Sequence, residues 1–103
     1  MTETLTVIND EAAHRFEIAI EGQTAFAEYS ISGHKMTLPH TVVPDDFEGR
    51  GVGSQLARAA LGVAREKGLK VIPTCPFIAG YIEKHPEWHD LMDDTWRGRL
   101  GIG

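Results

Sequence analysis

The pattern of hydrophobic and polar residues divides the chain into a first half rich in strands and a second half that contains helices. In the first half, hydrophobic side chains recur at every second position, as Phe16, Ile18 and Ile20 do, which is typical of a strand with one buried face. Glycine-containing turns separate three such segments, which span residues 15–21, 24–31 and 35–43. Pro39 lies inside the third segment. Because proline has no N–H to donate to a neighbouring strand, we expect a bulge or a splay there.

From Val52 onward the hydrophobic residues recur at helical spacing, which predicts a long α-helix. Gly68 is a typical residue to follow the last turn of that helix. A short apolar run at 69–72 predicts a buried strand, and Pro76 predicts the first residue of a second, short helix. The order of these elements indicates an α+β fold, a mixed α/β sandwich with a mainly antiparallel sheet.

Length and charge narrow the function classes. The 103 residues fit one domain, which we expect to span 1–94, with 95–103 (including Arg97 and Arg99) as a flexible C-terminal tail. The formal net charge of -5 disfavours nucleic acid and anionic membranes as partners and suits a cationic acceptor. The lone Cys75 allows no intrachain disulfide and favours a reducing, cytoplasmic setting. We expect no membrane span, and a monomer or weak dimer.

The segment 48–54, with the sequence Glu-Gly-Arg-Gly-Val-Gly-Ser, lies between the third strand and the long helix. Its closely spaced glycines and the positive end of the helix together suit a diphosphate. The Gly-Lys-Ser/Thr of a Walker A loop is missing, and Ser54 and Pro73 stand where a dinucleotide fingerprint needs a small residue and an acid. The remaining candidate is the acetyltransferase loop Gln/Arg-x-x-Gly-x-Gly/Ala, which Gly51 and Gly53 match.

The chain resembles the GNAT superfamily of N-acetyltransferases, and most closely its minimal, single-domain members, whose chains are about as long as this one. The shared segments are 38–44, 48–53, 73–77, 81–82 and 85–88, so the resemblance extends over most of the chain. It implies a GNAT-like fold, acetyl-coenzyme A as co-substrate, no metal, and acetyl transfer to an amine, such as a lysine or another protein substrate. Glu48 departs from the pattern, which has Gln or Arg at that position.

The resemblance also implies which residues contact the co-substrate. They come from the third strand, the glycine loop and the start of the short helix: Val42, Val43, Arg50, Gly51, Val52, Gly53, Ser54, Cys75 and Pro76. A backbone N–H of Val42 or Val43 is expected to polarise the thioester carbonyl. The amides of the glycine loop are expected to hold the diphosphate.

Two side chains are catalytic candidates. Cys75 directly precedes a helix, where the dipole stabilises a thiolate, so it is either a nucleophile, a wall of the active site or a small buried hydrophobe. His40 can take a proton from the attacking amine, or it can be packed against the sheet with one hydrogen bond. The resemblance implies that Ile82 replaces the tyrosine that acts as acid in many GNAT enzymes, and Tyr81 is expected to belong to the core.

The predicted function is therefore acetyl-coenzyme A-dependent N-acetylation by direct attack of a neutral amine, with an acyl-Cys75 intermediate as the alternative mechanism. A non-catalytic coenzyme A-binding or interaction module is the alternative function. A thiol redox or acyl-carrier role for Cys75 is disfavoured because the chain has no second cysteine. His85 and His89 have helical spacing, but Pro86 interrupts that helix and no third ligand is evident, so no metal site is expected.

Overall fold

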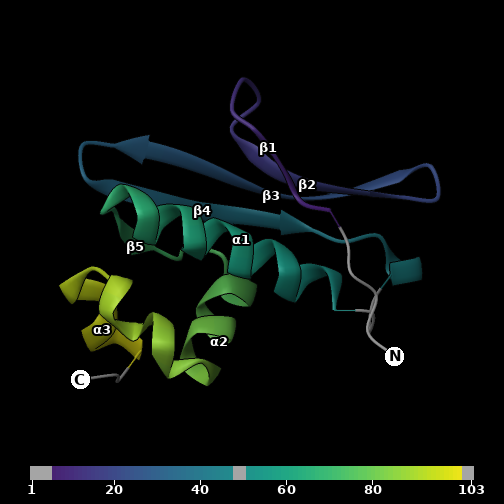
Figure 1. Cartoon of the computed structure of the whole chain (residues 1–103). Helices are drawn as coiled ribbons and strands as arrows, with labels where there is room; N and C mark the ends of the chain where they lie inside the picture. Colours follow the sequence, from purple (N-terminus) through teal and green to yellow (C-terminus); the bar gives the residue numbers. More distant parts are fainter. Residues whose placement is uncertain (1–5, 48–50, 101–103) are drawn as a thin grey trace.

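The computed structural model describes residues 6–47 and 51–100, which form one sheet covered on one side by helices (Figure 1). The five strands lie in the order β1-β2-β3-β4-β5, and only the β4–β5 pair is parallel. The strands are β1 (Ile8–Asp10), β2 (Arg15–Ile20), β3 (Gln23–Ser32), β4 (Lys35–Val42) and β5 (Lys70–Ile72). The expected α+β class with a mainly antiparallel sheet is confirmed.

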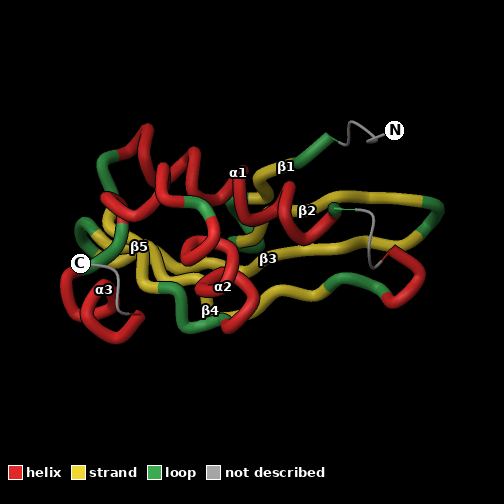
Figure 2. The backbone as a smooth tube through the Cα atoms, turned by 90° about the horizontal axis from the view of Figure 1, so that it is seen from below, coloured by secondary structure: helices red, strands yellow, loops and turns green. Residues whose placement is uncertain are grey.

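The helices follow β4 and flank β5 in the chain. The long helix α1 (Val52–Lys67) packs on the sheet, and the shorter α2 (Pro76–Lys84) lies beside it (Figures 1 and 2). Two 3₁₀ helices, η1 (Asp45–Phe47) and η2 (Pro86–Leu91), and the helix α3 (Asp94–Leu100) complete the fold. The predicted long helix after the glycine loop and the predicted short helix at Pro76 are confirmed.

The core lies between the sheet and α1. In β2 and β3 the side chains at alternate positions are buried, and they meet a stripe of small and branched residues on α1. The buried set on the strands is Phe16, Ile18, Ile20, Ala25, Ala27 and Tyr29, and on α1 it includes Leu56, Ala57, Ala60, Leu61 and Ala64. Because the alternation places polar side chains on the other sheet face, that face carries no helix in Figure 1.

The bulge predicted at Pro39 is confirmed by the register of β3 and β4. The two strands pair Ser30 with Thr37 on one side of the proline, and Glu28 with His40 on the other. Two steps along β3 therefore correspond to three along β4, so the extra residue lies in β4. Because of the extra residue, every side chain of β4 after the bulge lies on the opposite sheet face from the one that strict alternation would give it. The bulge therefore determines which side chains at the end of β4 face α1.

The C-terminal segment differs from the flexible tail expected at 95–103. It forms α3 as far as Leu100, while 101–103 lie outside the described residues. The side chain of Trp96 packs against the core, and the Asp93 carboxylate accepts a hydrogen bond from the N–H of Thr95 at 3.0 Å, as a helix cap does. No helix in the described part of the chain is both long and apolar enough to cross a membrane.

Candidate functional site

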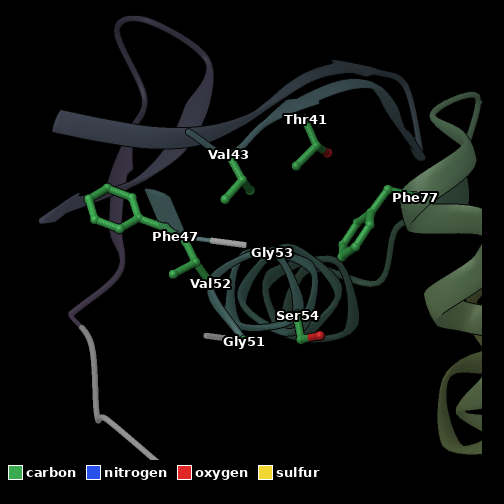
Figure 3. Close-up of a pocket in the computed structure, with 8 residues that line it drawn as sticks. All are labelled: Thr41, Val43, Phe47, Gly51, Val52, Gly53, Ser54 and Phe77. Atoms are coloured by element: carbon green, nitrogen blue, oxygen red, sulfur yellow. The ribbon is translucent and has the colours of Figure 1, made fainter. Parts of the chain in front are cut away.

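A hollow of about 430 Å³ opens between the end of β4 and the first turn of α1 (Figure 3). In Figure 3 the side chains of Thr41 and Val43 lie above α1, and Phe77 reaches in from α2. The lining residues are Thr41, Val43, Phe47, Gly51, Val52, Gly53, Ser54 and Phe77. The hollow thus brings Phe77 of α2 next to residues 41–54, which end β4 and begin α1.

The first turn of α1 offers backbone donors to this hollow. Gly51 precedes the helix with φ 76° and ψ 13°, a left-handed conformation that glycine adopts without strain. The N–H of Gln55 donates to the carbonyl of Gly51 at 3.1 Å, and the N–H groups before it, those of residues 52–54, precede the first helical hydrogen bond. No described side chain caps this end, and its first turn holds no acid. An anion at this end of α1 meets the positive end of the helix dipole.

Most of the residues expected to contact the co-substrate lie together here. Val43 and the four residues 51–54 line the hollow, and the backbone of Val42 ends the adjoining strand. Pro76 lies in a second hollow of about 260 Å³ next to the first. Arg50 and Glu48 lie outside the described residues.

Cys75 contacts β4 beside the hollow, through Thr41, but is not itself among the residues that line either hollow. Its N–H donates to the carbonyl of Leu38 at 2.9 Å, and its sulfur lies 3.5 Å from the hydroxyl oxygen of Thr41. The side chain is buried, and the residue is the N-cap of α2 with extended backbone angles. The thiol is therefore fixed beside the one lining residue of β4 that carries a hydroxyl.

The structure does not bring the two catalytic candidates together. Residues directly opposite in a sheet share a face, and Thr41 is opposite the buried Ala27, whereas His40 is opposite the exposed Glu28. The imidazole of His40 therefore lies on the helix-free face of the sheet, near the ring of Phe26. A base must come within hydrogen-bonding reach of the proton that it accepts, so His40 can serve only an amine that arrives from that face.

Tyr81 and Ile82 are both buried, Ile82 completely. The expectation that Tyr81 belongs to the core is confirmed, and its ring stacks on that of His85 with 4.0 Å between centroids. Ile82, expected to replace an acidic tyrosine, carries no hydroxyl group and is fully buried.

Sequence reasoning did not assign a role to Phe77 or Thr41. Thr41 could have been found by following the strand alternation through the bulge at Pro39, which turns it toward α1. Phe77 has an exposed ring, and no periodic pattern marks such a residue as part of a site. Within the described ranges, no three His, Cys, Asp or Glu side chains gather as a metal ion would require.

Comparisons with known proteins agree on one family. The family model of the GCN5-related N-acetyltransferases matches residues 15–91. Protein NATD1 of Xenopus tropicalis is 34% identical over 88 residues, which are 82% of this chain and 81% of that protein. Protein NATD1 of Mus musculus is 34% identical over 85 residues, 80% of this chain and 77% of that one. The solution structure of a GCN5-like protein from Staphylococcus aureus superposes with a TM-score of 0.70 and 30% identity, covering 86% of this chain and 88% of that one.

Proposed function

Since the chain belongs to the GCN5-related N-acetyltransferase family, we propose that it binds acetyl-coenzyme A and transfers the acetyl group to an amine. The observation that carries this proposal is the hollow between the end of β4 and the uncapped first turn of α1. The N–H groups at the start of α1 suit a diphosphate, and the adjoining end of β4 suits the long arm of the same ligand.

The residues of the glycine loop hold the diphosphate. The N–H groups of residues 51–54 donate hydrogen bonds to its oxygens, and the α1 dipole adds its positive end. Arg50, which lies next to this turn in the sequence, contributes a cation. Cys75, at the start of α2, borders the path from the diphosphate to the reactive end, and Pro76 borders the adjoining hollow on the α2 side.

The end of β4 supports the acyl transfer. When bound, acetyl-coenzyme A supplies the acetyl group as an activated thioester, whose carbon–sulfur bond breaks as the amine nitrogen bonds to the carbonyl carbon. An N–H of Val42 or Val43, beyond the bulge, stabilises the negative charge that develops on the carbonyl oxygen. His40 takes the proton of an amine that approaches from the helix-free face. The buried thiol of Cys75 is a wall of the site, and acetylation of that thiol is the alternative mechanism.

A second candidate function is coenzyme A binding without transfer, which the buried Ile82 favours. This position offers no hydroxyl group to protonate the departing thiolate. In this second candidate function, the glycine loop still binds coenzyme A, but no acetyl group is transferred.

Two measurements test the proposal. At a concentration about a hundred times the dissociation constant, acetyl-coenzyme A should raise the melting temperature by about 10–20 °C. Release of coenzyme A thiol should then depend on an added amine, tested with a panel of amines and lysine peptides. A shift in melting temperature without turnover would favour the coenzyme-binding module, and the absence of any shift would contradict both functions.

A further inference from the structure

Phe77 is an exposed aromatic residue in the middle of the proposed coenzyme site. It is the second residue of α2, and 46% of its surface is accessible. Its ring lines both the hollow at β4 and the smaller hollow on the α2 side, and Ser54 is the other residue that the two hollows share. The ring therefore lies at the boundary between them.

The position of the ring depends on Gly53. A Cβ atom added to this glycine would lie 2.7 Å from the Cζ atom of Phe77, closer than side chains approach. Two further ring carbons would lie at 3.1 and 3.3 Å from that Cβ, so the edge of the ring lies against the bare Cα of Gly53. Gly53 is not among the positive-φ residues, whereas Gly51 is, with φ 76°. The backbone at position 53 therefore does not itself require glycine, whereas a Cβ at this position would displace the ring of Phe77.

The two hollows differ in chemistry. The one at β4 is lined by residues 51–54, which in the proposed function hold the diphosphate, and by Thr41 and hydrophobic side chains such as those of Val43 and Phe47. The one on the α2 side includes Lys84 and His85, which can face an anionic nucleotide. A ligand with a charged nucleotide at one end and a less polar arm at the other would match the two hollows. Its arm would lie in the hollow at β4, and its nucleotide would lie in the hollow on the α2 side.

We propose that Phe77 is a positioning residue for the coenzyme, and that Gly53 is glycine in order to seat its ring. The ring packs against the pantetheine arm and holds it on the β4 side, while the nucleotide occupies the α2 side. This inference rests on the proposed coenzyme A binding and adds the residue that directs the arm toward Thr41 and Cys75.

Calorimetric titration with two probes tests the contact with the arm. Phe77→Ala should weaken the binding of coenzyme A roughly tenfold and leave adenosine 3′,5′-bisphosphate, which lacks the arm, unchanged within about twofold. Phe77→Tyr should restore most of the affinity, because its ring has the same shape. Ile31→Ala, which trims another exposed hydrophobic residue (44% accessible), is the matched control and should affect neither probe.

A double-mutant cycle tests the role of Gly53. Gly53→Ala should weaken coenzyme A binding severalfold in the natural chain, and it should have almost no effect in the Phe77→Ala background, where no ring is displaced. An equal loss in both backgrounds would mean that the phosphate needs the glycine directly, and it would overturn the inference. Unchanged affinity of Phe77→Ala for coenzyme A would overturn it too. If the natural chain bound no coenzyme A at all, the proposed function itself would fail.

Discussion

At the residue scale, Cys75 has two structural tasks that do not require a reactive thiol. It begins α2 and, through its N–H, bonds α2 to the carbonyl of Leu38 in β4. Its side chain is buried against Thr41. These contacts explain a small, moderately polar side chain at this position without covalent catalysis.

We predict that Cys75→Ala retains at least about a third of the turnover, because direct attack by the amine needs no acyl-enzyme. The measurement is the initial rate of coenzyme A release, together with the intact mass of the natural protein after incubation with acetyl-coenzyme A. Loss of more than about a hundredfold in the rate, with one acetyl group added to Cys75, would establish the covalent mechanism instead.

The residues of the candidate site that are easiest to identify from the sequence are those whose surroundings are local. The loop glycines and Ser54 adjoin a helix start, and a short window of sequence is enough to identify them. The orientation of His40 was not predictable in the same way, because one extra residue at Pro39 changes the face of every later side chain in β4. The contact of Phe77 with Gly53 joins two helices, and no periodic pattern of hydrophobic residues in the sequence predicts it.

At the scale of elements, α1 ends at Lys67, directly before the glycine that the sequence predicts as its C-terminal cap. Gly68 has φ 68°, and the N–H groups of Gly68 and Leu69 donate to the carbonyls of Arg65 and Ala64. This is the glycine-dependent termination that the helical period predicts. The helix α3 was missed because its anchor, Trp96, packs against residues distant in sequence and its glycine-containing sequence is a weak helix former.

Two glycine-to-alanine substitutions in and beside α1 should have opposite effects. Gly68→Ala should lower the free energy of unfolding by about 1 kcal/mol, because a Cβ is strained at positive φ. Gly62→Ala should raise it by about 0.5–1 kcal/mol, because residue 62 is inside the helix and a Cβ there meets nothing within 4 Å. Urea denaturation of both variants is the measurement, and effects of the same sign would contradict this description of the helix.

At the scale of the whole molecule, Asp93 joins the C-terminal helix to the sheet. Its carboxylate lies 2.9 Å from the Lys35 ammonium in β4 and accepts the N–H of Thr95 at the start of α3. Its backbone N–H donates to the carbonyl of Val71 in β5. The hydrogen bond from Lys35, followed by that from Thr95, lowers the pKa of this carboxyl below its ordinary 3.8.

This lowered pKa makes part of the stability sensitive to acid. A group whose pKa is lower in the folded state stabilises the fold above its unfolded pKa, here about 3.8, and loses that contribution as the pH falls through the folded value. Asp93→Asn should therefore be less stable than the natural protein near neutral pH, and this difference should shrink below about pH 4. Chemical denaturation across this range is the measurement, with Asp94→Asn as the control next to it. A difference that stays constant with pH would contradict the assignment.

In the proposed function, the first turn of α1 binds the diphosphate of coenzyme A. The most direct test is a titration of ¹⁵N-labelled protein with coenzyme A, followed by backbone amide chemical shifts. The largest changes are predicted at the amides of Gly51, Val52, Gly53 and Ser54, with smaller ones at Val42 and Val43. Binding that leaves these amides unmoved, or shifts concentrated elsewhere on the surface, would contradict the account.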